Sequence, residues 1–339
     1  MKKILVTGGL GYIGSHTVVA LQQAGFEVLI IDDLSNAQKT TLDRIYEITN
    51  IKPSLFVIDL KNHDSVSAFF QSNKVDGIIH FAAHKAVGES VEKPLMYYRN
   101  NLLGLINLLE VMDRFSVDNF IFSSSCTVYG QADFMPINEN TPLKRPEAPY
   151  GKTKHMGEEI ISDFVNATNK NAIALRYFNP VGAHESGLIG ELPNGIPNNL
   201  LPYITQTAAG MRKSLGVFGD DYETRDGTAI RDYIDVNDLA DAHVKALNRL
   251  LDKKNKQGLE FYNLGSGTGS TVMEMIKAFE KANNLEIPYE IKERRTGDIQ
   301  EAYADYSLAE KELNWKPQKD LETSMRTSWN FQCKQEKVK

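Results

Sequence analysis

The chain has 339 residues, of which 42% are hydrophobic and 24% are charged. This length predicts about two domains of roughly 150 residues each, and the composition excludes disordered, fibrous and membrane-embedded classes. The 38 Lys and Arg residues are outnumbered by 44 Asp and Glu, and the net charge of -6 excludes a general positive field that would favour nucleic acid or an anionic membrane.

The start of the chain and its cysteines predict an ordinary cytoplasmic protein. The apolar run that begins at Ile4 ends after three residues, and no later segment approaches the ~20 residues of a membrane helix. Only Cys126 and Cys333 are present, without a CxxC motif or His-rich neighbours. We therefore expect neither a disulfide nor a metal site.

Short β-branched or aromatic runs recur along the first half of the chain, as is typical of buried parallel strands. Segments with the length and period of helices separate them, which predicts right-handed βαβ units with helices on both faces of the sheet. The expected fold class is α/β, with a doubly wound parallel sheet. The expected strands are residues 4–6, 28–31, 55–58, 77–81, 120–122 and 173–175.

Glycines directly follow the first expected strand. Residues 7–14 read TGGLGYIG, and a helical pattern begins close behind them. In such a strand, turn and helix, glycines let the backbone approach a pyrophosphate, and the free N–H groups of the helix N-terminus favour its charge. The motif predicts a Rossmann-like dinucleotide site at Gly8, Gly11 and Gly14.

Acidic residues end the second and third expected strands. Asp32 lies 18 residues beyond Gly14, where a carboxylate can accept hydrogen bonds from an adenosine ribose and repel a 2'-phosphate. The expected cofactor is therefore NAD rather than NADP. The neighbouring Asp33 is more typical of a helix cap, and Asp59 lies at a similar edge of the sheet.

One expected helix, at about residues 94–112, has an unusually wide apolar surface. Leu95, Tyr98, Leu102 and Leu105 alternate at spacings of three and four, and Leu103 belongs to a flanking apolar face. This surface exceeds what one contact with a sheet needs. It predicts self-association, unless other parts of the same chain cover it.

A serine-rich strand end and a downstream helix supply the candidate catalytic residues. Ser123 to Ser125 end one strand, and Tyr150 and Lys154 stand four residues apart on one helix face. A tyrosine with a pKa near 10 needs about 4 kcal/mol of stabilisation of its phenolate to act as a base near pH 7. Lys154 and a positively charged nicotinamide could supply this together, while Ser125 orients a substrate hydroxyl.

From about residue 181, the pattern changes to connections rich in Gly, Pro and Asn, with scattered short elements. We expect a dinucleotide-binding domain over residues 1–180. A smaller α/β domain for the substrate is expected over residues 181–339, with some of its elements returning to the first domain.

Together with the glycine turn and the set of Ser125, Tyr150 and Lys154, several segments resemble the extended short-chain dehydrogenase/reductase superfamily. The stronger resemblance is to its UDP-glucose 4-epimerase family, and it spans nearly the whole chain. The segments are HFAAHKAVGES at 80–90, RYFNPVGA at 176–183, GIPNNL at 195–200, RDYI at 231–234 and RRTGD at 294–298.

This resemblance implies an isomerase that retains NAD throughout turnover. Tyr150 would remove the proton of the sugar 4-hydroxyl as hydride leaves C4. The transient 4-keto sugar would turn about its link to the pyrophosphate and take the hydride back on its other face. UDP-glucose and UDP-galactose would then interconvert without net redox, and the nucleotide would anchor the substrate.

The resemblance also implies the ligand contacts. Arg231 and Arg295 suit a pyrophosphate because their planar guanidinium groups make charge-assisted hydrogen bonds. The implied cofactor residues are Gly8, Gly11, Tyr12, Ile13, Gly14, Asp32, Asn36, Asp59, Leu60, Phe81, Ala82, Ala83, Lys85, Asn100, Ser125, Tyr150, Lys154 and Phe178. The implied substrate residues are Lys85, Ser125, Tyr150, Phe178, Asn179, Asn199, Leu200, Phe218, Arg231, Arg295, Asp298 and Ala302. The expected assembly is a homodimer.

The family pattern has a gate position beside the sugar, and members restricted to glucose and galactose have a bulky Tyr there. Without a gap, that position aligns with Ala302. The small side chain predicts that UDP-GlcNAc and UDP-GalNAc are also substrates. The alternative is that the neighbouring Tyr303 closes the pocket.

Three other functions compete with this one. A nucleotide-sugar 4,6-dehydratase needs an acidic pair after the catalytic serine, where this chain has Cys126 and Thr127. A dehydrogenase or reductase with net redox could use the same Ser, Tyr and Lys, but would consume free cofactor. A non-enzymatic NAD-binding sensor would not need all three catalytic residues.

Overall fold

The computed structural model describes residues 1–295 and 298–336. Its largest element is a seven-stranded sheet in the order β10-β6-β5-β4-β1-β2-β3, in which every pairing is parallel. Its strands are β1 Lys3–Thr7, β2 Glu27–Asp32, β3 Ser54–Val57, β4 Gly77–His80, β5 Asn119–Ser123, β6 Asn171–Tyr177 and β10 Leu259–Leu264.

Alternate side chains of these strands enter two separate cores, because neighbouring residues of a strand point to opposite faces. Ile4 and Val6 of β1 belong to one core and Leu5 to the other. The first core lies under α1, α2, α8 and α10, and the second under α3, α5 and α6. Burial on both faces explains the nearly continuous apolar runs of the central strands.

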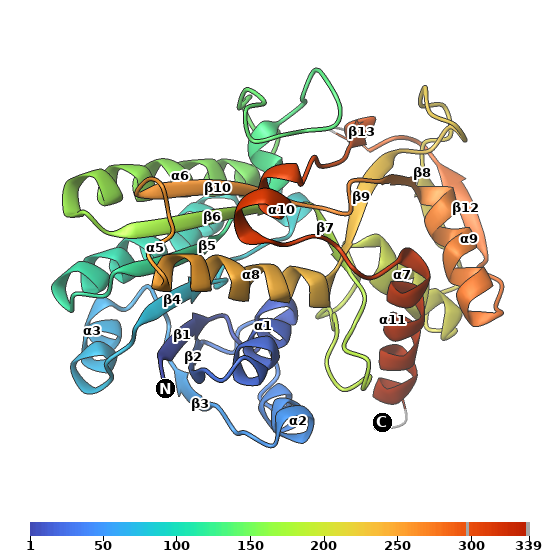
Figure 1. The fold of residues 1–339 in the computed structure, drawn as a ribbon. Coiled ribbons are helices and arrows are strands. Elements are labelled where there is room, and N and C mark those ends of the chain that lie inside the picture. Colours follow the sequence, from blue (N-terminus) through green and yellow to red (C-terminus); the bar gives the residue numbers. More distant parts are fainter. Residues whose placement is uncertain (296–297, 337–339) are drawn as a thin grey trace.

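The helices of this first lobe surround the sheet (Figure 1). A 3₁₀ turn, η1, covers Cys126–Tyr129. The helices are α1 Tyr12–Gln23, α2 Thr40–Thr49, α3 His63–Ser72, α4 Val87–Glu92, α5 Pro94–Arg114, α6 Pro149–Thr168, α8 Val236–Leu251 and α10 Ser307–Leu313.

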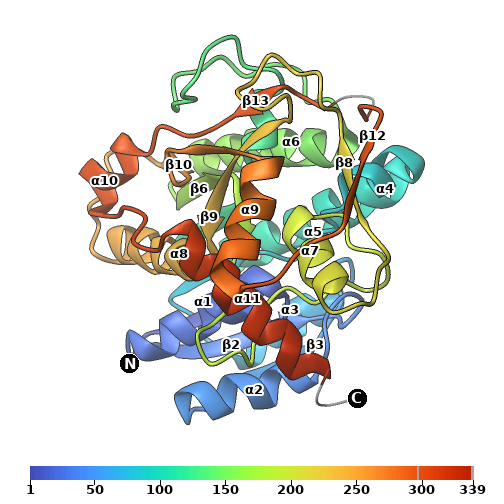
Figure 2. The same cartoon turned by 90° about the vertical axis from the view of Figure 1, so that its right-hand side faces the viewer.

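A second, smaller lobe stands at the carboxyl ends of the main strands, to the right in Figure 1. Helices α7, α9 and α11 pack against one another in it (Figure 2). Met275, Phe279 and Met325 are fully buried among them. Its elements are β7 Asn179–Val181, α7 Leu200–Ala208, β8 Leu215–Phe218, β9 Ile230–Asp235, β11 Gly269–Thr271, α9 Val272–Asn283, β12 Tyr289–Lys292, β13 Glu301–Ala302 and α11 Leu321–Glu336.

The later part of the chain divides between the two lobes. Helix α8 packs against α1, and β10 pairs with β6 at the edge of the main sheet. Residues 181–339 are therefore not one separate block. The six strands expected from the sequence are present with ends shifted by one or two residues, whereas β10 was not foreseen because Glu260 and Asn263 interrupt its apolar pattern.

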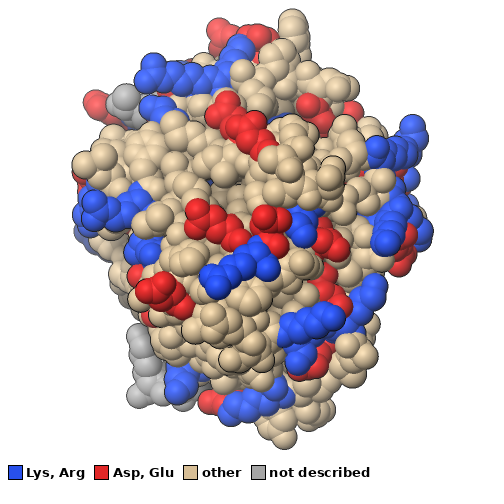
Figure 3. Space-filling view, turned by 90° about the vertical axis from the view of Figure 1, so that its left-hand side faces the viewer, with Lys and Arg blue, Asp and Glu red and all other residues tan. Residues whose placement is uncertain are grey.

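Both signs of charge are present on the surface. On the face in Figure 3, Lys and Arg side chains alternate with Asp and Glu, so this face has no continuous basic patch. Within residues 1–295 and 298–336, no helix combines the length and the apolar character needed to cross a membrane.

Candidate active site

The glycine turn connects β1 to α1 at the point where the strand order reverses, between β1 and β4. Gly8 has a φ of +68°, and a Cβ there would lie 2.8 Å from the Ala82 nitrogen. A Cβ on Gly14 would lie 2.2 Å from the Gly8 carbonyl oxygen. Helix α1 begins after Gly11, with no side chain capping its first N–H groups and no acidic residue in its first turn. This cradle fits the pyrophosphate of a dinucleotide.

The acidic residues at the neighbouring strand ends are held by backbone donors. The Leu10 and Leu34 N–H groups donate to the two oxygens of Asp32, at 3.1 and 2.9 Å. Burial raises the pKa of Asp32, and the two backbone donors oppose that rise. Asp33 accepts from the backbone and hydroxyl of Ser35 in a local turn. It does not cap the next helix as expected, because α2 begins only at Thr40, after Lys39.

A polar cluster at the end of β3 contains two further expected cofactor residues. The Lys61 ammonium lies 3.0 Å from an oxygen of Asp59 and donates to Asn100 Oδ1 at 2.9 Å. Lys61 lowers the pKa of Asp59 despite an opposing burial effect. On the far side of the turn, Asn36 accepts from the amide of Asn194 at 3.1 Å.

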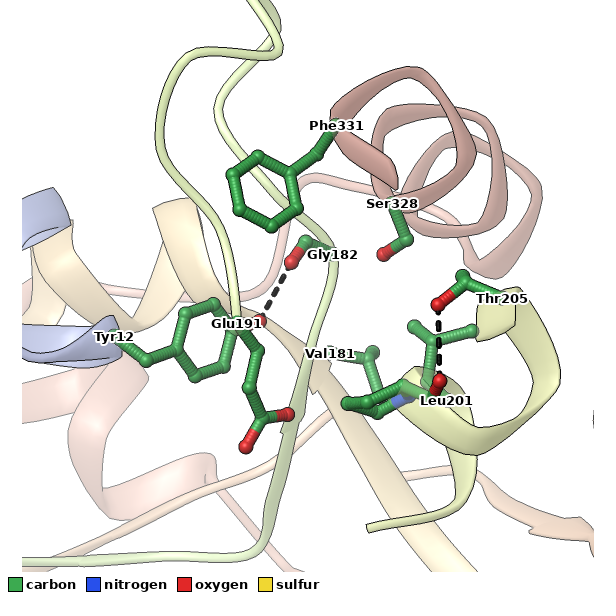
Figure 4. Close-up of a pocket in the computed structure, with 9 residues that line it drawn as sticks. Tyr12, Val181, Gly182, Glu191, Leu201, Thr205, Ser328 and Phe331 are labelled. Atoms are coloured by element: carbon green, nitrogen blue, oxygen red, sulfur yellow. Dashed lines mark hydrogen bonds between the residues drawn. The ribbon is translucent and has the colours of Figure 1, made fainter. Parts of the chain in front are cut away.

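A carboxylate that the sequence analysis missed bridges the two lobes. Glu191 Oε1 accepts from Lys85 Nζ and from Asn199 Nδ2, both at 2.7 Å. Lys85 Nζ also lies 5.9 Å from the centre of the Tyr12 ring. Figure 4 shows Glu191 beside Tyr12, whose hydroxyl donates to the Gly182 carbonyl at 2.6 Å. Two expected ligand residues, Lys85 and Asn199, are thus tied to one acid.

The three candidate catalytic residues meet at the end of β5. Ser125 caps η1 and accepts from the backbone and hydroxyl of Thr127 at 3.2 and 3.1 Å. Ser125 lies close enough to Tyr150 to lower the pKa of its hydroxyl. One turn further along α6, Lys154 Nζ lies 6.0 Å from the centre of the Tyr150 ring and donates to the Ser123 carbonyl at 2.6 Å.

Burial dominates the titration of this group. It raises the pKa of Tyr150 far above its ordinary value, and the hydrogen bond from Ser125 only partly offsets that rise. Burial also lowers the pKa of Lys154 to about 8, against the opposing effect of Glu158. The protein's own groups therefore leave Tyr150 protonated at neutral pH. A second cation beside the ring would favour its phenolate.

The expected sugar pocket borders a small apolar cluster. Phe178 and Ala302 are both buried in it, together with Val128 and Tyr129 of η1. Tyr303 points the other way, because a Cβ on Gly269 would lie 3.1 Å from its ring. This alternation along the strand places Ala302, rather than Tyr303, beside Phe178.

The expected nucleotide residues gather on the second lobe. The Arg295 guanidinium stacks on Phe218 at 3.7 Å from the ring centre. Arg231 Nη2 lies 3.9 Å from Asp298 Oδ1, and the Asp298 N–H donates to the Arg295 carbonyl at 3.2 Å. Residues 296 and 297 of the RRTGD segment lie outside the described residues. Two arginines and one acid are therefore close enough to serve a single phosphate-bearing ligand.

Some expected ligand residues turn their side chains into the cores. Ile13 packs against the first core, Leu60 is buried in the second, and Leu200 packs against the core of the smaller lobe. Phe81 packs on His243 with ring centres 4.7 Å apart, Asn179 is exposed at the start of β7, and Ala82 and Ala83 are half-buried after β4.

Sequence reasoning also missed Glu158, which lies one turn after Lys154 and pairs with Arg176 in the protein interior. A signal was present, because Arg176 interrupts a buried strand and a buried charge needs a partner. In the two described parts of the chain, no group of three or more His, Cys, Asp or Glu residues is arranged to hold a metal.

Comparisons with known proteins agree with this geometry. The model of the GDP-mannose 4,6 dehydratase family matches residues 5–328. A UDP-glucose 4-epimerase from Haemophilus influenzae is 52% identical over 97% of both chains. The structure of UDP-glucose-4-epimerase from Stenotrophomonas maltophila, with bound NAD and formylated UDP-arabinopyranose, superposes with a TM-score of 0.96 at 44% identity over 100% of both chains. The enzyme from Bifidobacterium longum, in complex with NAD+ and UDP, gives 0.94 at 46% over 98% of both.

Proposed function

Because the chain belongs to the UDP-glucose 4-epimerase family, within the broader GDP-mannose 4,6 dehydratase family of short-chain dehydrogenases/reductases, we propose that it interconverts UDP-glucose and UDP-galactose using tightly bound NAD. The observation that carries this proposal is the position of Lys154 one turn after Tyr150 on α6, with Ser125 at the start of η1 close enough to lower the pKa of Tyr150. This group lies at the same sheet edge as the glycine turn, since β5, β4 and β1 are neighbours.

In the proposed reaction, Tyr150 accepts the proton of the sugar 4-hydroxyl and later returns a proton to the same oxygen. Ser125 orients that hydroxyl, and Lys154 supports the tyrosine phenolate with its charge. Bound NAD would supply the acceptor and donor of the C4 hydride. General acid–base catalysis of this kind contributes about 10²- to 10⁴-fold to the rate.

The two-lobed arrangement supports a division of labour. Residues 1–180, with α8 and β10 returning to them, would hold the cofactor. The Arg231, Arg295 and Asp298 cluster would hold the UDP. The nucleotide would stay anchored while the 4-keto sugar turns, because the binding residues and the reacting residues lie on different elements.

We infer a broader sugar specificity from Ala302. The short side chain stands beside Phe178, and Tyr303 faces Gly269 instead. A 2-acetamido group could occupy the volume that a tyrosine at position 302 would fill. UDP-GlcNAc and UDP-GalNAc are therefore proposed as additional substrates.

The dehydratase chemistry named by the broader family model is not favoured by this chain. That elimination needs an acid and a base beside the serine, where Cys126 and Thr127 stand. Burial raises the pKa of the Cys126 thiol to about 12, so it stays protonated at neutral pH. The Thr127 hydroxyl donates a hydrogen bond to Ser125.

We further propose that the protein is a cytoplasmic homodimer without nucleic-acid or membrane partners.

Proton NMR tests the proposal directly. Purified protein is mixed with UDP-galactose, and in parallel with UDP-GalNAc, without added cofactor. Growth of the UDP-glucose anomeric signal is expected, followed by a mixture of constant composition. A requirement for stoichiometric added NAD would instead indicate net redox, and no conversion even with added NAD would refute the epimerase proposal.

The catalytic role of Tyr150 has its own test. Tyr150→Phe should lower kcat by about 10²- to 10⁴-fold while bound NAD, measured by absorbance after denaturation, is retained. Tyr262→Phe is a matched control, since Tyr262 is also buried but bonds Glu260 at the far edge of the sheet. An active Tyr150→Phe variant would contradict this role.

A further inference from the structure

Glu158 is a buried acid directly behind the catalytic residues. It is 3% exposed and lies four residues after Lys154 on the same face of α6. Its Oε1 accepts from Ser124 Oγ at 2.5 Å and from Arg176 Nε at 2.9 Å, and its Oε2 accepts from Arg176 Nη2 at 2.7 Å. Ser124 immediately precedes Ser125, so the carboxylate is connected to both catalytic segments.

Arg176 extends these contacts to three more elements. Its Nη1 donates to the Tyr129 hydroxyl at 3.0 Å, which in turn donates to Asn263 Oδ1 at 2.7 Å. Its guanidinium lies 4.3 Å from the centre of the Phe261 ring. Helix α6, strands β5, β6 and β10, and η1 are therefore joined by one polar network with good geometry.

The surroundings of Lys154 make the charge of Glu158 important. The Lys154 ammonium donates to the Ser123 carbonyl of β5 and lies 5.0 Å from the centre of the Phe122 ring, also of β5. From β4, it faces His80, whose pKa burial and Lys154 lower to about 3, so that it is neutral. Burial and the nearby Tyr177 of β6 raise the pKa of Tyr150, which favours its neutral form. Glu158 is the charged group that raises the pKa of Lys154.

We propose that Glu158 is a positioning residue for the epimerase reaction. Its carboxylate keeps Lys154 in the charged form across one turn of α6, and through Ser124 it fixes the backbone that carries Ser125. Arg176 holds the carboxylate in place for both tasks. This inference rests on the proposed function, because it assigns Glu158 to the same site.

A purely structural role is the competing explanation, and the chain contains a matched control for it. Arg249 and Glu260 form a second buried, two-pronged pair, with Nε–Oε2 and Nη2–Oε1 distances of 2.6 and 3.1 Å. Their side chains are 7% and 6% exposed. This pair joins α8 to β10, away from Ser125 and Tyr150. Removing the Glu158 carboxylate leaves Arg176 without its bidentate partner, whereas Arg249 keeps Glu312, whose Oε2 lies 3.1 Å from its Nη2.

The test is the pH dependence of kcat for the NAD-loaded enzyme carrying Glu158→Gln or Glu260→Gln. Loss of the Glu158 charge lowers the pKa of Lys154, because Glu158 is the group that raises it. Lys154 then loses its proton at lower pH. The alkaline limb of the profile, where kcat falls at high pH, should therefore shift to lower pH by about one unit. Glu260→Gln should leave the limb in place. An unmoved limb in Glu158→Gln would overturn the proposal.

Two more variants keep the test decisive. Glu158→Asp preserves the charge, so its alkaline limb should return towards the wild-type position even if kcat is reduced.

A double variant serves if Glu158→Gln does not fold. Glu158→Leu combined with Arg176→Met removes both charges with apolar replacements, and its alkaline limb should still shift to lower pH. An unmoved limb there would also overturn the proposal. Absence of epimerisation by the wild-type protein would instead refute the proposed function itself.

Discussion

Ala302 is the residue on which the proposed sugar specificity depends. It is 5% exposed, lies in β13 next to Arg231 of β9, and packs with Phe178. Its neighbour Tyr303 packs on Gly269 on the opposite side of the strand. The direction of the side chain, and not only its size, therefore decides which residue borders the pocket.

Ala302→Tyr should remove activity on UDP-GalNAc selectively. The larger ring would occupy the volume of the 2-acetamido group. Because a mismatch of one methylene in a pocket already changes kcat/KM by about 10- to 200-fold, kcat/KM for UDP-GalNAc should fall by at least about 10-fold. Activity on UDP-galactose should change far less. Both rates are measured by NMR.

Tyr303→Leu is the matched control for this prediction. It should leave the ratio of the two activities unchanged, because Tyr303 faces away from Phe178. A change of the ratio in Tyr303→Leu, with none in Ala302→Tyr, would reverse the assignment of the gate.

At the scale of single elements, the turn from β1 to α1 shows how tightly backbone geometry constrains a binding site. A Cβ on Gly8 would meet the backbone of Ala82, and one on Gly9 would meet Ile30 of β2. A Cβ on Gly14 would meet the Gly8 carbonyl. The turn is closed by the Gly11 N–H donating to the Gly8 carbonyl at 3.1 Å. Side chains would push this turn away from the path of a pyrophosphate.

Gly14→Ala should abolish retention of NAD and destabilise the first lobe. Its Cβ would lie 2.2 Å from the Gly8 carbonyl oxygen, and relief of such overpacking costs about 1–3 kcal/mol. Gly88→Ala is the control, because a Cβ at Gly88 meets nothing within 4 Å. Bound NAD is measured by absorbance after denaturation and stability by urea unfolding. Full NAD content in Gly14→Ala would contradict the assigned site.

Helix α5 illustrates how one element can serve two surfaces. Its buried side, including Leu105, Leu108 and Met112, packs into the second core. Its other side leaves Leu95 81%, Leu103 39% and Ile106 38% exposed. The same chain therefore covers only part of the wide apolar face that the sequence predicts. The remainder is the surface proposed for the homodimer.

At the scale of the whole molecule, this exposed surface predicts the oligomeric state. Exposed apolar area of this kind marks contact with another chain. Light scattering at micromolar concentration should give a dimer for the wild-type protein and a monomer for the Leu103→Arg, Ile106→Arg double variant. Replacing two exposed residues elsewhere, Tyr289 and Ile291, by arginine should not change the mass. A monomeric wild-type protein would refute the homodimer.

Three fully enclosed histidines predict how the stability of the molecule depends on pH. Burial lowers the pKa of His16 and His80 to about 3 and that of His243 to about 4. Between these values and about 6.5, the unfolded chain binds protons that the folded chain does not. Stability contributed by the neutral histidines is therefore complete above about pH 6.5 and is lost as the pH falls.

Each histidine should lower the free energy of unfolding by about 1.4 kcal/mol per pH unit below that point. Urea unfolding at pH 7, 6 and 5 measures this slope. His243→Leu should reduce the slope by about 1.4 kcal/mol per pH unit, the contribution of one histidine, since it removes one titrating group from the core. A pH-independent free energy of unfolding over this range would contradict the neutral state of these side chains.

Most of the local features followed from the sequence because they depend on short-range spacing. Apolar runs predicted six of the seven strands of the main sheet. The glycines after β1 required a tight turn, and the four-residue spacing of Tyr150 and Lys154 required a shared helix face. The candidate ligand residues came from the family resemblance, and their roles remain proposals.

Tertiary structure alone decided which distant segments meet. It placed β10 beside β6, turned Leu60 and Ile13 into the cores, and faced Ala302 rather than Tyr303 towards Phe178. It also joined Lys85 and Asn199 through Glu191, and Ser124 and Arg176 through Glu158. Periodicity reports the face on which a residue lies, but not its partner. Partners are selected by packing and by the need of buried charges for compensation, which involve residues far apart in the chain.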